Sequence, residues 1–201
     1  MFITLFSRLG DVKCSVLKHD CALVSSLQKQ TTRPQTWDLH GFFIWLQHFM
    51  ANYSELIDTI AEQTGGEFRA ASASDLAALG ALGLPQTVLD FFAEFEPAEC
   101  IEGAERLWPI SEIVNENTGF VPGCNISGHG YIVFSTTGCG DTFCFDLNQM
   151  SPAGEPRIVF MSHETDYESM TAAEIHDLAV LVASNLYDFL GLFAREELGE
   201  F

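Results

Sequence analysis

Apolar residues recur at helical spacing in the segment that follows residue 50. Residues 54–63 place their apolar side chains on one stripe, which predicts a helix. Ser72 precedes a short apolar stretch and can cap a second helix. A third helix is predicted by five apolar residues on one face: Leu84, Val88, Phe91, Phe92 and Phe95. Pro85 suits the first turn of this helix, and Pro97 ends it.

The pattern changes to short strand-like runs after residue 130. Residues 131–136 and 142–147 form two such runs, and the glycine-containing residues 138–141 between them predict a β-hairpin. Successive side chains of a strand point to opposite faces, so Phe143 and Phe145 would share one face of the sheet. We therefore expect antiparallel strands in the middle of the chain.

A third strand is predicted at residues 157–161, and a final helix follows it. Thr171 and Glu174 form a capping box that would open this helix. Its buried face would come from one continuous stripe: Ile175, Leu178, Val182, Leu186, Phe189, Leu190 and Phe193. This order of elements indicates an α+β fold, with a mainly antiparallel sheet flanked by N-terminal helices and a long C-terminal helix.

Charge divides the chain into two unequal parts. The 201 residues hold 28 Asp and Glu against nine Lys and Arg, a net charge of −19. Residues 1–49 contain five basic and three acidic residues, whereas residues 50–201 contain four basic and 25 acidic residues. We interpret residues 1–49 as a weakly ordered N-terminal extension or linker, with Met50 as a plausible natural start, and residues 50–201 as the folded domain.

The acidity of the larger part limits its partners. It would repel the phosphate backbone of a nucleic acid, and it would attract a basic protein and speed their encounter. The simpler alternative is that the charge only confers solubility. The apolar run at residues 41–50 is too short to span a bilayer, and residues 1–10 lack the basic start of a signal peptide. With no Cys-x-x-Cys pair either, we expect a soluble, reduced, cytoplasmic protein without a membrane partner.

Candidate catalytic and cofactor motifs are weak. Asp141 and Asp146 are five residues apart and could be paired carboxylates for hydrolysis or cation ligands, but a turn role for Asp141 fits the predicted hairpin better. Gly138-x-Gly140 lacks the third glycine, the lysine and the following helix of a phosphate loop. Neighbouring residues 162–164 hold Ser, His and Glu but cannot face one another as a triad. We expect no catalytic residue and no cofactor.

Metal binding is equally weakly indicated. Cys14, His19 and Cys21 lie near one another in the sequence without the four-ligand spacing of a zinc site. Cys139, Cys144 and His163 could meet in space, but a buried cysteine that packs as a small apolar residue is the default interpretation. We expect no metal site.

Acidic residues gather in two groups that could dock the Lys and Arg side chains of a partner. The first lies in residues 96–107, predicted to be an exposed loop, and the end of the helix before it: Glu94, Glu96, Glu99, Glu102 and Glu105. The second follows the third strand: Glu164, Asp166 and Glu168. The alternative is an ordinary solvated surface.

Five segments in a fixed order resemble the SUKH superfamily, which includes cell-wall-assembly-regulator-like proteins and many bacterial immunity proteins. They are residues 82–85, 108–114, 140–146, 159–164 and 188–190. The resemblance covers about residues 50–195. It implies a non-enzymatic α+β domain that binds and neutralises a cognate toxin domain, often a nuclease; a second branch of the superfamily acts as a regulatory scaffold. Residues matching characteristic family positions, which we expect to be mainly structural, are Trp108, Gly140, Asp141 and Asp146.

Three functions follow from these observations. The leading hypothesis is an acidic immunity-type protein that binds a basic toxin, for which a neighbouring toxin gene would be the discriminating observation. The first alternative is a regulatory module that binds endogenous proteins, favoured if no toxin gene lies nearby. The second is a small hydrolase that uses Asp141 and Asp146.

Overall fold

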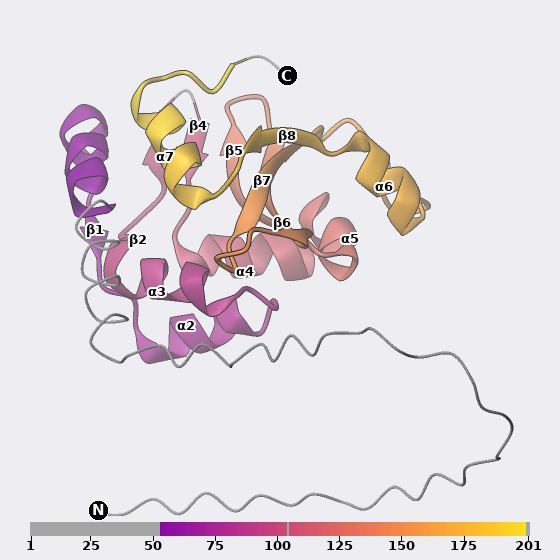
Figure 1. Cartoon of the computed structure of the whole chain (residues 1–201), viewed down its shortest axis with the longest axis horizontal. Helices are drawn as coiled ribbons and strands as arrows, with labels where there is room; N and C mark the ends of the chain where they lie inside the picture. Colours follow the sequence, from indigo (N-terminus) through magenta and orange to yellow (C-terminus); the bar gives the residue numbers. More distant parts are fainter. Residues whose placement is uncertain (1–52, 104, 200–201) are drawn as a thin grey trace, which may run out of the picture. The chain divides into compact units, whose positions relative to one another are not determined.

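The computed structural model describes residues 53–103 and 105–199, and the predicted extension at residues 1–49 lies outside these ranges. The described part is an α+β domain built on a six-stranded antiparallel sheet of order β3-β4-β5-β6-β7-β8 (Figure 1). The strands are β3 (Ile101–Glu102), β4 (Glu105–Leu107), β5 (Tyr131–Thr137), β6 (Thr142–Met150), β7 (Pro156–Met161) and β8 (Val180–Ala183). The predicted fold class and the hairpin of β5 and β6 are confirmed.

The predicted N-terminal helices are present. Residues 53–64 are helical, and α2 (Ala73–Gly80) and α3 (Gln86–Phe95) follow. Ser72 caps α2 as expected, because its side chain accepts a hydrogen bond from the Asp75 backbone N–H. A small two-stranded sheet pairs β1 (Phe68–Arg69) with β2 (Glu96–Pro97), so the segment before α2 is joined to the segment after α3.

A helical connection between β4 and β5 places α4 (Ile110–Gly119) against the sheet, followed by α5 (Gly123–Ile126) and a single 3-10 turn (Ser127–His129). Buried Asn117 fastens α4 to β5. Its side-chain amide donates to the Val133 carbonyl at 2.7 Å, and its side-chain oxygen accepts from the Val133 N–H at 2.9 Å. The side chain thus bonds a backbone donor and acceptor that would otherwise lie unpaired in the core.

Both faces of the central strands are buried. On one face, Phe134, Phe143 and Phe145 pack with the helix at residues 53–64, α3, α4 and α7 (Leu186–Ala194). On the opposite face, a smaller cluster packs α5 and α6 (Ala172–Leu178) on side chains of β5, β6 and β7: Tyr131, Val133, Cys144, Val159 and Met161. The alternation predicted for residues 142–147 is therefore correct, and each face has its own core.

The predicted exposed loop at residues 96–107 is wrong. Seven of these residues form β2, β3 and β4, and Glu96 and Glu105 are buried. The sequence favours a loop because glutamate is rarely buried. Backbone pairing of β4 with β5 and of β2 with β1 supplies hydrogen bonds that cannot be inferred from local composition.

The predicted long C-terminal helix is also wrong. The capping box of Thr171 and Glu174 opens α6 as expected, but α6 ends at Leu178 and the chain then forms β8. Valine-rich β8 pairs with β7, and this pairing competes successfully with the helical spacing of the same residues. Asn185 then caps a separate helix, α7, by accepting from the Asp188 N–H at 2.8 Å.

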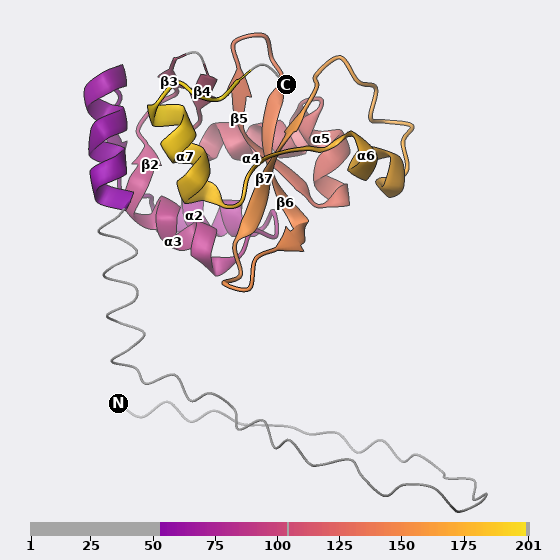
Figure 2. The same cartoon turned by 45° about the horizontal axis from the view of Figure 1, so that its top comes forward.

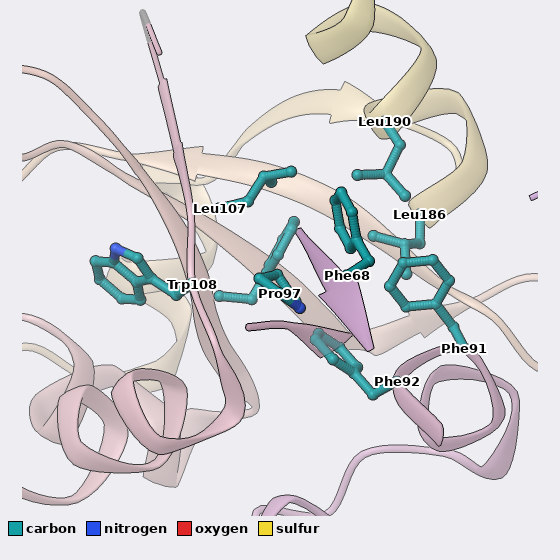
Figure 3. A pocket seen from close by; sticks show the side chains of 9 residues that line it. Phe68, Phe91, Phe92, Pro97, Leu107, Trp108, Leu186 and Leu190 are labelled. Carbon is teal, nitrogen blue, oxygen red and sulfur yellow. The ribbon is translucent and has the colours of Figure 1, made fainter. Parts of the chain in front are cut away.

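A narrow apolar cavity of about 20 Å³ lies between α3, α7 and the sheet (Figure 3). Its lining side chains include Phe68, Phe91, Leu107, Leu186 and Leu190, which point toward one another. A space of this size without polar groups holds at most one water and offers that water no partner. We therefore assign it to core packing and not to ligand binding.

Candidate protein-interaction surface

The register of the sheet brings three connecting segments to the same end of the domain (Figure 2). Glu105 in β4 lies opposite Thr137 at the end of β5, and Thr142 at the start of β6 lies opposite Met161 at the end of β7. The β3–β4 connection, the β5–β6 turn and the loop after β7 therefore meet there. Three inter-strand spacings separate β4 from β7, about 14 Å. The second acidic group and the Glu102–Glu105 part of the first are thus within reach of one partner surface.

Most of the carboxylates predicted to bind a partner lie at this end. Glu102 is exposed in β3 and Glu105 is buried in β4, whereas the whole second group is exposed in the loop after β7. Buried Tyr167 holds this loop close to its strand, because its hydroxyl donates to the Ser162 carbonyl at 2.9 Å. We call the carboxylates at this end of the sheet the acidic rim: Glu102, Glu105, Asp141, Glu164, Asp166, Glu168 and Glu196.

The rest of the first acidic group is elsewhere. Glu94 and Glu99 are exposed. They precede β3 in the chain, so they lie before the strand whose far end carries Glu102. Glu96 is only 2% exposed and cannot be a docking residue in the folded domain. Its carboxylate is 3.4 Å from Arg69 Nε and accepts from the Ile110 N–H at 3.3 Å. Glu96 therefore holds the N-terminus of α4, where a negative charge is favoured.

The β5–β6 turn is fastened to the end of β7 by Asp141. Its side chain accepts from the His163 backbone N–H at 3.0 Å and lies 2.9 Å from His163 Nδ1. Although partial burial raises the pKa of Asp141, hydrogen bonds from His163 and Ser162 bring that pKa below its usual range. Gly140 precedes it with a φ of +99°, a conformation that side-chain-bearing residues rarely adopt. Asp141 thus connects the β5–β6 turn to the loop after β7, and both segments carry residues of the rim.

The other residues at characteristic family positions lie inside the domain. Asp146 is completely buried in β6, and its carboxylate pairs with Arg157 Nε of β7 at 2.8 Å and accepts from the Asn148 N–H at 2.9 Å. Trp108 is partly buried and packs against the core clusters on both faces of the sheet. Both residues contribute to the framework that carries the rim.

Asp141 and Asp146 do not form a paired-carboxylate site. They are separated by five residues of an extended strand, about 16 Å at the rise of a β-strand. Paired carboxylates that hydrolyse glycosides are at most about 9.5 Å apart. Each aspartate also has its own cationic or histidine partner, so the structure does not support chemistry that needs both at one substrate atom.

The cysteine and histidine residues considered as ligands are not arranged around a common centre. Cys139 is exposed in the turn, while Cys144 is buried and burial raises the pKa of its thiol to about 12. Within the described residues, no group of three His, Cys, Asp or Glu side chains is spaced to hold a metal ion. The candidates Cys14, His19 and Cys21 lie outside the described residues.

Every arginine in residues 53–103 and 105–199 is ion-paired with a carboxylate. The pairs are Arg69–Glu96, Arg106–Glu102, Arg157–Asp146 and Arg195–Glu197. The lysines of the chain, Lys13, Lys18 and Lys29, all precede this part. The described surface therefore offers a partner many unpaired carboxylates and no unpaired arginine or lysine.

A comparison with protein families covers most of the domain. The model of the SMI1 / KNR4 family (SUKH-1) matches residues 74–191, more than half of the chain, from α2 into α7. The chain belongs to the SUKH-1 family. The resemblance to the SUKH superfamily that the ordered segments indicate is thereby confirmed. A search of curated proteins finds no significant match.

Membership of the SUKH-1 family is consistent with an immunity-type or protein-interaction module. The matched region contains most of the acidic rim, including the β3–β4 connection, the β5–β6 turn and the loop after β7. None of the helices described in the SUKH-1 chain has both the length and the hydrophobicity that crossing a bilayer requires.

Two rim residues were not among the sequence candidates for partner binding. The sequence predicts a mainly structural role for Asp141, with a hydrolytic role as an alternative, and no pattern points to Glu196. Glu196 lies just after α7, about ninety residues from Glu105, and the two line the same cleft. No local pattern signals this proximity, because it depends on how α7 packs on the sheet.

Three buried or half-buried carboxyls predict how the stability of the SUKH-1 domain depends on pH. Burial, followed by nearby carboxylates, raises the pKa of Glu105, Glu116 and Glu155. A carboxyl whose pKa rises on folding stabilises the folded state at low pH, and this contribution is lost as the pH rises through the raised value. We therefore expect a higher midpoint of thermal unfolding at about pH 5.5 than at about pH 8, at constant ionic strength.

The pKa values of Asp141 and Glu174 are lowered, so these two carboxylates stabilise the folded state at neutral pH. This stabilisation is lost only as the pH falls through the lowered pKa values, which lie below both of the pH values compared. A triple variant with glutamine at positions 105, 116 and 155 should lose much of the difference between the two pH values. A midpoint that is higher at pH 8 than at pH 5.5 in the unmodified domain would contradict the assignment.

Proposed function

We propose that this SUKH-1 domain is a non-enzymatic, immunity-type protein that binds and neutralises a basic toxin domain through the acidic rim. The observation that carries the proposal is that the second acidic group meets Glu102 and Glu105 of the first at one end of the sheet. All arginines of the described residues are already paired with carboxylates. Such a surface attracts a cationic partner and disfavours anionic ones. Neutralisation would follow from occlusion of the toxin's active site by the bound domain.

The segments that carry the rim are held in place before a partner binds. The segments of the rim are anchored to the sheet by the Asp141–His163 contact and by the Tyr167 hydroxyl, so little loop ordering is needed on binding. Exposed charges at an interface mainly set the association rate, which should therefore depend strongly on salt.

The first test is co-expression with the toxin domain encoded beside the gene. We expect restored growth and a stoichiometric complex whose association rate falls at least tenfold between about 50 and 500 mM NaCl. Unchanged toxicity together with no complex at low salt would refute the immunity function. Absence of a neighbouring toxin gene would favour the regulatory alternative.

The second test locates the contact with two variants of equal charge. One replaces Glu164, Asp166 and Glu168 by their amides, and the control replaces Glu55, Asp58 and Glu62, which are exposed on the helix at residues 53–64. Measured by surface plasmon resonance at low salt, the rim variant should associate roughly tenfold more slowly and the control less than about threefold more slowly. Equal losses would show that net charge alone, and not the rim, attracts the toxin.

A further inference from the structure

A cleft of about 200 Å³ opens within the acidic rim, at its β3–β4 end. Its walls come from the end of the helix at residues 53–64, from the β3–β4 hairpin and from the end of α7. Three carboxylates line it: Glu102, Glu105 and Glu196. Phe193 adds one aromatic wall. This volume is about ten times that of the apolar cavity in the core, and it has a charged lining.

Glu105 distinguishes this cleft from an ordinary acidic surface. The residue is only 9% exposed, yet its carboxylate has no hydrogen bond or ion pair with another described residue and is bonded only to its own backbone N–H. Burial and the Glu196 charge raise the pKa of Glu105. A largely buried carboxylate without a cationic partner among the described residues destabilises the free domain, and a cation in the cleft would relieve that cost.

Glu196 is held in a conformation that would suit glycine. It follows α7 with a φ of +54°. The Glu196 N–H bonds the Phe193 carbonyl at 3.1 Å and the Glu197 N–H bonds the Leu192 carbonyl at 2.9 Å, which is the Schellman pattern of a helix end. Glycine is the favoured residue at this position, so glutamate here adds a charge to the cleft at some cost in backbone strain.

The chemistry of the lining selects the occupant. The carboxylates are not spaced to hold a metal ion within the described residues. Glu102 is already paired with Arg106 Nε at 2.8 Å. Glu105 and Glu196 are left without a cationic partner among residues 53–103 and 105–199. A guanidinium can donate to two carboxylates at once and can rest its planar face or its aliphatic stem on an aromatic ring such as Phe193.

We infer that the cleft receives one arginine side chain of a protein partner, held between Glu105 and Glu196 against Phe193. The inference deepens the proposed function and rests on it for the basic nature of the partner. The cleft would act as the desolvated anchor of the contact, while the exposed carboxylates of the rim steer the encounter.

The test uses an acetylated and amidated arginine as the probe, with the neutral isostere citrulline as the comparison, followed by NMR of the full chain. Arginine should produce saturable shifts at the Gly103, Glu105 and Phe193 amides with a dissociation constant of roughly millimolar order. Glu105→Gln and Glu196→Gln should each weaken this binding at least fivefold, whereas Glu94→Gln, at an exposed acid outside the cleft, should change it less than twofold.

Stability measurements separate this role from a structural one. Glu105→Gln and Glu196→Gly should each weaken arginine binding but raise the midpoint of thermal unfolding. The first removes a largely buried charge, and the second removes backbone strain at a positive φ. Equal shifts with citrulline, no loss in the Glu105 variant, or an equal loss in the Glu94 variant would overturn the inference. A toxin complex without arginine binding would leave the immunity proposal standing and remove the cleft from it. Arginine binding without a toxin complex would leave the cleft as an arginine site and remove the immunity proposal.

Discussion

Replacing Arg157 with methionine should lower the free energy of unfolding by about 3–5 kcal/mol, measured by denaturant titration. The Asp146 carboxylate is completely buried, and among the described residues its only cationic partner is Arg157 Nε at 2.8 Å. Methionine keeps much of the aliphatic packing of arginine but removes the charge. The aspartate would then be left buried with a single backbone hydrogen bond from Asn148, and desolvation of an unpaired charge is expensive.

Arg195→Met is the matched control, because Arg195 and Glu197 form an ion pair of similar length, 2.7 Å, with both side chains more than half exposed. Its loss should change stability by less than about 1 kcal/mol. The double variant with leucine at position 146 and methionine at position 157 should recover most of the stability, since it buries no unpaired charge. Equal effects of the two single arginine variants would contradict a structural role for the buried pair.

Phe189→Ala should destabilise the domain by about 3–5 kcal/mol, through lost burial and the cavity left behind. The Phe189 ring is fully buried and contacts the rings of Phe134 and Phe143 at centroid distances of 5.0 and 5.1 Å. It is a main attachment of α7 to the sheet. The variant should therefore also disturb the cleft at the end of α7, which amide hydrogen exchange around Phe193 would detect.

Phe120→Ala removes the same side chain from a site that is 62% exposed and should change stability by less than about 0.5 kcal/mol. The contrast tests whether α7 is docked on this face of the sheet as described. If the alanine at position 189 were tolerated as well as the one at position 120, the assignment of Phe189 to the core would be incorrect.

The elements that could be predicted from the sequence are those whose signals are local. The Ser72 cap, the apolar stripe from Leu84 to Phe95 and the β5–β6 turn depend on residues close together in the chain, and all are present. The C-terminal helix was predicted incorrectly because residues 180–183 satisfy a helical stripe equally well, and only their pairing with β7 decides in favour of a strand.

The candidate site was predicted in its residue types but not in its arrangement. Glu102 and Glu164 belong to separate acidic groups in the sequence, and the strand register that brings their segments to one end of the sheet is a tertiary property. Conversely, Glu96 looked like a surface acid, because its partners Arg69 and Ile110 are 27 and 14 residues away. Composition predicts an acidic surface, but only the strand topology shows which acidic residues lie at the same end of the sheet.

The position of β8 at one end of the sheet order has a consequence for behaviour at high concentration. An outermost strand presents unpaired backbone groups that can template the addition of a strand from another molecule. Val180 and Leu181 of β8 are 47% and 57% exposed, which would favour such self-association. A net charge of −19 repels like molecules, so the same acidity that suits a basic partner also keeps these edges apart in dilute buffer. Concentrated stocks should accordingly be kept at low ionic strength and well above the isoelectric point of about 4.4.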